Sequence, residues 1–190
     1  PPSGFFNKKG IWLIPWALVL VSNFVTVRQL AADFHFNQGR KLQENFSWGE
    51  AEKAYEKAIH LSPFFDLYHE ALGLLYERKA AIAFSRKQRG TFVDKAIQSY
   101  QEASRLQPYR ARLHHDQAAL YEMKGDLLHA QSEFLKAIAL EPTNGLFLYD
   151  YGDFALKHSW VKEAIEVFER LNNLPFPGDA RAGPSEILTR

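Results

Sequence analysis

The feature that most constrains the fold of this chain is a spacing of about 34 residues that recurs along it. Gly39 and Gly73 stand at this spacing, and so do Pro108 and Pro142. A pattern of alanine, aromatic ring and alanine recurs at the same spacing after a longer first interval, with leucine as its last residue in the final copy. Its four copies are Ala51-Tyr55-Ala58, Ala96-Tyr100-Ala103, Ala130-Phe134-Ala137 and Ala164-Phe168-Leu171.

These residue types suit two helices packed closely together. A small residue on the first helix and alanines on the second let the backbones approach, while the ring between the alanines fills the gap beside them. A proline after the second alanine, as at Pro63, ends the second helix. Residues that can cap a helix stand where the second helices should begin, namely Ser47, Thr91, Asp126 and Ser159.

Paired helices at this spacing resemble the tetratricopeptide repeat (TPR) family. The resemblance implies an all-α fold, a TPR helical-hairpin solenoid of about four repeats, in which each hairpin contacts its neighbours. The solenoid is predicted at residues 32–172, with an extended, Pro- and Gly-rich tail at 173–190. Its repeats are expected at about 32–65, 66–110, 111–144 and 145–177.

The second repeat carries an insertion near residues 79–92. The interval from Gly73 to Ala96 is about twice the interval from Gly39 to Ala51, which joins the matching residues of the first repeat. One interpretation is a lengthened helix with a solvated loop. The other is a docking element for an acidic partner or for anionic headgroups. The basic residues that would serve the second are Arg86, Lys87 and Arg89.

A run without ionisable side chains, residues 10–27, precedes the repeats. As a helix it would reach about 27 Å at ~1.5 Å per residue, close to the ~30 Å hydrocarbon core of a bilayer. Trp12 and Trp16 lie where aromatic side chains would meet the headgroups. The run predicts a transmembrane helix at 10–31 after a flank at 1–9, with lipid contact through 10–27. A signal-peptide core and a buried soluble helix are the alternatives.

A span at this place would make the chain a single-pass membrane protein. Lys8 and Lys9 precede the run, and only Arg28 follows it closely. This bias favours an N-terminus inside and repeats on the extracytoplasmic, periplasmic side.

The order of segments resembles the C-terminal region of bacterial O-antigen ligase and polymerase-like (Wzy-type) membrane proteins. The similarity covers nearly the whole chain: the apolar run, residues 28–39 and 48–63, the interrupted second unit, and 144–152. In that family a polytopic membrane part carries the glycosyl-transfer chemistry, and a TPR tail follows its last span. The resemblance implies that this chain is such an accessory tail. No residue here would then inherit the family's catalytic arginine or histidine. The missing initiator Met favours a fragment.

Charge and motifs weigh against several functions. The net charge is +1 and both signs alternate along the chain, so we expect no nucleic-acid partner. There is no cysteine, and zinc, P-loop and nucleophile-elbow motifs are absent. We therefore expect no enzyme, no metal site and no cofactor. His35, His69 and His114 occupy the same place in their repeats, which predicts a role in packing at helix interfaces.

The first helices of TPR hairpins line a groove, and their inward positions form the candidate binding site. Mixed charge and aromatic rings suit an extended peptide or a loop of a partner subunit; an ordinary solvated face is the alternative. Phe36 and Arg40 replace the lysine and asparagine of the clamp that binds chaperone carboxylates, so that partner is not expected. We expect a non-catalytic scaffold that assembles a membrane complex and binds protein partners through Phe36, Arg40, Glu77, Arg78, Arg112, His115, Tyr149 and Lys157.

Overall fold

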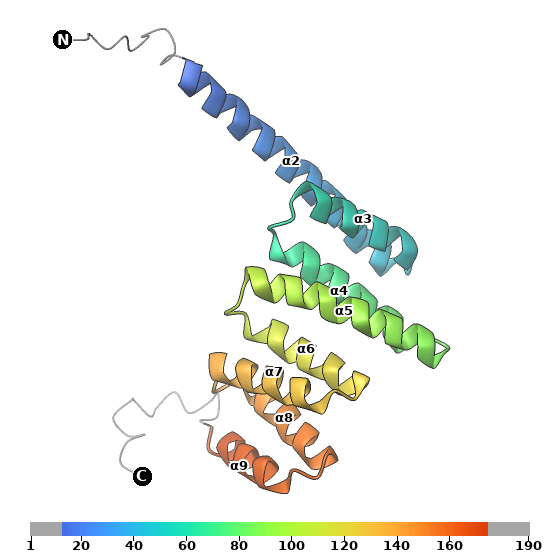
Figure 1. Ribbon diagram of the computed structural model, residues 1–190, viewed down its shortest axis with the longest axis vertical. Helices are drawn as coiled ribbons and strands as arrows, with labels where there is room; N and C mark the ends of the chain where they lie inside the picture. Colours follow the sequence, from blue (N-terminus) through green and yellow to red (C-terminus); the bar gives the residue numbers. More distant parts are fainter. Residues whose placement is uncertain (1–12, 175–190) are drawn as a thin grey trace, which may run out of the picture. The chain divides into compact units, whose positions relative to one another are not determined.

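The computed structural model describes residues 13–174, and all of the regular structure in that range is helical. The chain divides into two compact units, Pro1–Gln107 (unit 1) and Pro108–Arg190 (unit 2). Each unit contains two helical hairpins, whose members lie side by side in Figure 1. The helices of unit 1 are α2 (Leu13–Glu44), α3 (Trp48–Leu61), α4 (Asp66–Ala81) and α5 (Arg86–Leu106). Those of unit 2 are α6 (Ala111–Lys124), α7 (Leu127–Leu140), α8 (Gly145–Lys157) and α9 (Val161–Asn172).

Packing of a glycine against an aromatic ring sets the distance between the two helices of a hairpin, as the sequence predicts. In the first hairpin, a Cβ added to Gly39 would lie 2.7 Å from the Tyr55 ring. In the last, a Cβ on Gly152 would lie 2.6 Å from the Phe168 ring. Tyr55 is buried. Since carbon atoms do not pack at such distances, only glycine lets these helices come so close.

Consecutive hairpins are joined in both units by rings on the first helices. In unit 1, Tyr68 on α4 is fully buried and packs against Ala32 on α2 and Ala58 on α3. Gln29 on α2 donates a hydrogen bond of 2.8 Å to the Tyr68 hydroxyl. In unit 2, Phe147 on α8 is buried against α6 in the same manner.

The insertion lengthens both helices of the second hairpin. α4 continues to Ala81 and α5 begins at Arg86, where the side chain of Ser85 accepts a hydrogen bond from the Gln88 N–H. The start predicted at Thr91 is therefore wrong, because Thr91 lies inside α5 and its hydroxyl bonds the Lys87 carbonyl.

The other predicted caps differ among themselves. Asp126 caps α7 by accepting a hydrogen bond from the His129 N–H at 3.3 Å. Ser47 is the N-cap residue of α3 but makes no side-chain cap bond. Ser159 has a φ of 62°, and Trp160 takes the N-cap position of α9 instead.

The predicted transmembrane helix is not found. No helix among residues 13–174 is both long enough and apolar enough to cross a bilayer. Within the described part of α2, the polar residues Ser22 and Asn23 interrupt the apolar run. The predicted membrane localisation is therefore wrong, and with it the extracytoplasmic placement of the repeats. Residues 10–12, with Trp12, lie outside the described range, and Trp16 lies in α2.

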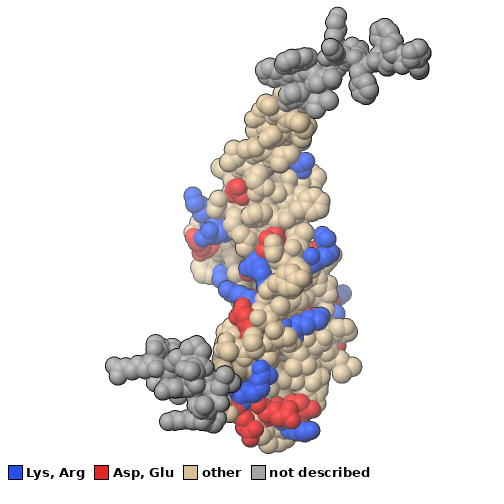
Figure 2. All heavy atoms as spheres, turned by 90° about the vertical axis from the view of Figure 1, so that its left-hand side faces the viewer, with Lys and Arg blue, Asp and Glu red and all other residues tan. Residues whose placement is uncertain are grey.

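Neither is α2 a buried helix over this stretch. Side chains 18–28 are all exposed, with Leu20 at 69% and Phe24 at 62%. Figure 2 shows this part of the molecule as a surface with few charged atoms. From Arg28 onward the helix contacts α3, and from Gln29 onward it also contacts α4.

Candidate functional site

Three of the four groove residues predicted in unit 1 line one cavity. Phe36 and Arg40 on α2 and Arg78 on α4 surround an open space of about 470 Å³. Because α2 and α4 are the first helices of their hairpins, this cavity lies on the side that the repeat predicts for binding. Tyr55, Leu67, Leu74, Glu44 and Glu70 complete most of its wall.

The floor of this cavity is aromatic. The Phe36 ring centroid lies 5.9 Å from that of Tyr55 and 5.1 Å from that of Tyr68. The Tyr55 hydroxyl donates a hydrogen bond of 3.0 Å to Gln43 Oε1. Rings fixed by packing and by a hydrogen bond make a rigid base, so a ligand would lose little free energy in ordering them.

Two arginines stand at the edge of the cavity. Within the described residues, no hydrogen bond or ion pair holds the guanidinium of Arg40 or that of Arg78. Burial raises the pKa of Tyr55 to about 12, while the positive charges of Arg40 and Arg78 oppose that rise. Both guanidinium groups therefore act on the same hydroxyl and can act on the same ligand.

Glu77, the fourth predicted residue of unit 1, has a different role. Its carboxylate accepts a hydrogen bond of 3.1 Å from the hydroxyl of Tyr100. Gln43 holds the same relation to Tyr55 one repeat earlier, since both residues follow their glycine by four positions. Glu77 thus fixes a core ring and does not line the cavity.

Three of the predicted residues of unit 2 are engaged with acids. His115 Nε2 is 2.7 Å from Asp150 Oδ2, and the ring stacks on Phe147 at 4.8 Å. Arg112 lies 3.6 Å from Asp116, and Lys157 is 2.7 Å from the Asp153 carboxylate. The fourth, Tyr149, is 55% exposed and meets the Phe168 ring edge-on at 6.2 Å.

Histidine–carboxylate pairs extend through unit 2. His114 Nδ1 is 2.6 Å from Glu133 Oε2 on α7, and this hydrogen bond raises the pKa of His114 against the opposing effect of burial. Burial lowers the pKa of His115, but hydrogen bonds to Asp116 and Asp150 outweigh it and the net shift is upward. Because Glu133 lies on α7 and Asp150 on α8, the two histidines join α6 to both helices.

The packing role predicted for the equivalent histidines is confirmed for two of them. His69 Nε2 lies 2.9 Å from the Pro63 carbonyl, and His114 Nε2 lies 3.2 Å from that of Pro108. Each ring therefore binds the connection that precedes its own helix. The Nδ1 atom of His35 is buried without a hydrogen-bond partner in the described structure.

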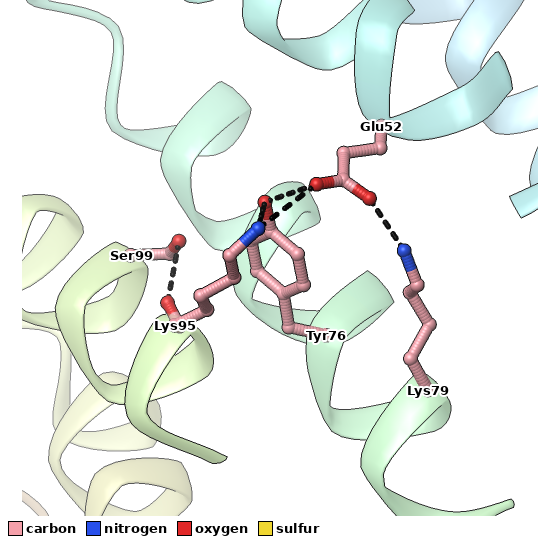
Figure 3. A network of polar contacts seen from close by, with 5 residues as sticks. All are labelled: Glu52, Tyr76, Lys79, Lys95 and Ser99. Carbon is pink, nitrogen blue, oxygen red and sulfur yellow. Dashed lines mark hydrogen bonds and ion pairs between the residues drawn. The ribbon is translucent and has the colours of Figure 1, made fainter. Parts of the chain in front are cut away.

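A polar network missed by sequence reasoning links three helices of unit 1 (Figure 3). Glu52 on α3 accepts hydrogen bonds from the Tyr76 hydroxyl at 2.7 Å and from Lys79 on α4. Lys95 on α5 lies 3.3 Å from the same carboxylate. Burial raises the pKa of Glu52, but the bonds from Lys79, Tyr76 and Lys95 outweigh it, so the pKa is lowered overall.

Aromatic rings beside this network contact the ammonium groups of its two lysines. Lys79 Nζ lies 4.9 Å from the centre of the Phe92 ring, and Lys95 Nζ lies 4.8 Å from that of Tyr76. The positions of Glu52, Tyr76 and Lys95 follow no motif that a sequence would reveal, because their meeting depends on how three helices are rotated. The network stabilises the contact between the two hairpins of unit 1.

The basic residues of the insertion, Arg86, Lys87 and Arg89, lie on the first turn of α5 and are exposed. Their part in docking stays a prediction. Within residues 13–174, no group of three or more acidic, histidine or cysteine side chains could hold a metal ion.

Comparisons with known proteins give structural matches only. No protein-family model matches the chain, and no curated protein matches it by sequence. The resemblance to O-antigen ligases therefore gains no support and stays a prediction.

Solved structures with similar architecture exist. MamA superposes with a TM-score of 0.64 at 16% identity, over 74% of this chain and 76% of MamA. TTC0263, a thermophilic TPR protein of Thermus thermophilus, has a TM-score of 0.63 at 16% identity, over 87% of this chain and 90% of its own. The first TPR of Spaghetti (RPAP3), solved with the HSP90 peptide SRMEEVD, gives 0.57 at 15%, over 69% and 95%. At such identities a likeness shows the fold alone, and that fold is TPR-like and all-helical.

Proposed function

We propose that this chain is a protein-interaction scaffold whose unit 1 cavity binds an extended partner segment carrying an acidic side chain. The observation that carries the proposal is the pair Arg40 and Arg78, whose guanidinium groups have no partner in the described structure. A guanidinium binds a carboxylate through two parallel hydrogen bonds, which are about twice as strong as neutral ones. Two such groups at one cavity favour an acidic ligand.

The aromatic and aliphatic wall determines the rest of the ligand. Phe36 and Leu74 are part-buried, and Leu67 is 41% exposed, so apolar surface remains available beside the arginines. Glu44 and Glu70 also line the cavity and would oppose a purely acidic peptide. The ligand that fits is therefore an extended segment with one or two acids next to an apolar residue.

The fold supports binding and assembly as the kind of function. A TPR-like structure of another protein, the RPAP3 domain, was solved with a bound peptide. The proposal assigns no chemical reaction to the cavity. The competing binding surface is the start of α5, where Arg86, Lys87 and Arg89 are exposed.

A peptide-selection experiment tests the proposal. A displayed library of random linear peptides would be selected for binding to the immobilised chain. The affinity of the selected peptides would then be measured by fluorescence anisotropy. We expect enrichment of acidic residues beside apolar ones. The double variant Arg40→Glu/Arg78→Glu should weaken binding at least about 100-fold, since each lost charge-assisted hydrogen bond contributes about 1.5–3 kcal/mol.

A control with the same change of charge distinguishes the two surfaces. Arg86→Glu/Arg89→Glu should change the affinity less than about threefold, as expected of exposed charges outside a binding site. The opposite pattern would move the site to the start of α5. Selected peptides without acidic residues, or binding unaffected by either double variant, would refute the proposal.

A further inference from the structure

One position of the repeat is buried in every described hairpin except the first. It is occupied by Tyr68 on α4, Leu113 on α6 and Phe147 on α8, which are 0%, 0% and 4% exposed. The equivalent residue on α2 is Phe34, since it precedes Tyr68 by one repeat spacing. Phe34 is 67% exposed. A large ring therefore lies in water at a place where the repeat normally packs it.

The structure shows what covers this position elsewhere. The Tyr68 ring lies against the Phe36 ring of the preceding hairpin, with centroids 5.1 Å apart. In unit 2 the Phe147 ring stacks on the His115 ring of the preceding hairpin at 4.8 Å. Phe36 and His115 occupy the same place on their own first helices. Each buried ring is therefore covered by a planar side chain of the hairpin before it.

The last hairpin presents the same covering surface, and within the described residues no further hairpin packs on it. Tyr149 on α8 is the equivalent of Phe36 and His115, and it is 55% exposed. Beside it, Leu146 is 60% exposed, and Leu171 and Leu174 are only part-buried. An aromatic ring with aliphatic neighbours thus remains available at the end of the repeats.

From these two surfaces we infer that copies of this chain associate head to tail, with Phe34 of one copy packed on Tyr149 of the next. The contact would repeat the hairpin-to-hairpin contact found inside each unit. Two packed rings attract each other beyond the effect of the apolar area that they bury. The inference is independent of the peptide cavity in unit 1.

The residues around the two rings match in the same register. Inside unit 1, Leu72 on α4 shares a cavity with Ile59 on α3. The position of Leu72 is taken on α2 by Gln38, and that of Ile59 is taken on α9 by Asn172. At the two ends of the repeats, polar side chains thus replace both members of the apolar pair found inside unit 1. In the proposed contact, Gln38 of one copy would therefore face Asn172 of the next and not an apolar side chain.

The apolar part of the α2 surface also continues beside Phe34. Val27 and Leu30 lie on the same helical face, and each is 64% exposed. Farther along that face, Lys41 is exposed, and Glu169 is exposed on α9. Opposite charges at the two ends favour their association over contact between two identical ends.

In a head-to-tail dimer, one copy still has an unused Phe34 surface and the other an unused Tyr149 surface, so further copies can add. We expect sedimentation velocity to show a mean mass that rises with protein concentration and passes that of a dimer. The variants Phe34→Glu and Tyr149→Glu should each weaken self-association at least about tenfold, because a carboxylate replaces a ring at the centre of the contact. Phe84→Glu is the control, since Phe84 is fully exposed between α4 and α5.

Mixing the two variants gives the sharpest test. Phe34→Glu retains a normal Tyr149 surface, and Tyr149→Glu retains a normal Phe34 surface. An equimolar mixture should therefore form dimers that do not grow, although each variant alone stays monomeric. A monomeric native chain at all concentrations would overturn the inference, and so would a mixture that stays monomeric or a native assembly that stops at the dimer. Circular dichroism of each variant would verify its helical fold.

Discussion

Units 1 and 2 share their helical packing but differ in their ionic pairs. In unit 1 a carboxylate, Glu52, binds two lysines from α4 and α5, and Arg40 and Arg78 remain unpaired beside a cavity. In unit 2 the carboxylates mostly meet histidines, as in His114–Glu133. Since histidine changes its charge near neutral pH and lysine does not, the same repeat gives two units with different responses to pH.

The two units also differ in whether their groove residues are available to bind a ligand. The positions that the sequence marks for a groove carry unpaired cations in unit 1, whereas in unit 2 Arg112, His115 and Lys157 are next to acids. A charge already paired within the chain must give up that partner before it can bind a ligand. Equivalent positions in a repeat therefore do not have equivalent capacity to bind.

The largest expected change in the free energy of unfolding concerns unit 1 alone. Glu52→Gln removes the charge that holds Lys79, whose side chain is 16% exposed, and should destabilise unit 1 by about 2–3 kcal/mol. Hydrogen exchange with mass spectrometry would show faster exchange in α3–α5 and no change in α7–α9. The matched control is Glu102→Gln, in an exposed pair with Arg105, where we expect less than about 0.5 kcal/mol. Equal effects of the two variants would contradict the role given to the network.

A smaller effect compares the glycine contacts of the two units. Gly39→Ala should cost about 1–2 kcal/mol, because Tyr55 is buried, its hydroxyl is hydrogen-bonded, and it cannot move aside. Gly152→Ala should cost less, about 1 kcal/mol, because Phe168 is only part-buried and can shift. Chemical denaturation would measure both losses.

The control for the glycine variants is Gly49→Ala. Nothing lies within 4 Å of a Cβ added there, so the better helix propensity of alanine should stabilise α3 by about 0.5–1 kcal/mol. If Gly39→Ala also stabilised the protein, close approach to the ring would not be what sets the helix spacing.

The smallest effect is a pH dependence confined to unit 2. The pKa values of His114 and His115 are raised in the folded state, so their stabilisation is complete below the unfolded value of ~6.5 and is lost as pH rises through the folded values. We expect unit 2 to lose about 1 kcal/mol as the pH rises above ~6.5. The pKa of Glu133 is lowered, so its contribution is lost only on acidification below about 4.5.

Hydrogen exchange at a series of pH values, corrected for the intrinsic rate, would measure this dependence in each unit. The double variant His114→Asn/His115→Gln removes both titrating groups and should abolish it in α6–α8. A loss of the same size in α3–α5 above pH 6 would show that the histidine pairs are not its cause.

Much of the fold follows from the sequence because the repeat fixes its own packing. Glycines and rings at a constant spacing determine which helix faces meet, and the structure has Gly39 and Gly152 against the expected rings. The transmembrane prediction failed because a run without charge is not the same as a run that is apolar throughout. Ser22 and Asn23 carry no charge but lower the mean hydropathy of α2.

The candidate site was only partly predictable. Phe36, Arg40 and Arg78 could be placed together because their positions in the repeat are four residues apart and so share one face of the first helices. The pairing of charges could not be predicted, because His115 and Asp150 lie on different hairpins and meet only through the rotation of two helices. A position in a repeat predicts where a side chain points, and its neighbours decide whether it is available.

The contact of glycine with ring leaves most other positions of such a chain free to vary. If a few small residues and rings suffice to hold hairpins together, most outward positions are free to vary without loss of the architecture. An identity of 16% with MamA at a TM-score of 0.64 is what such freedom would produce. What such chains share would then be the intervals between glycines and rings, whereas the outward residues would differ with what each chain binds.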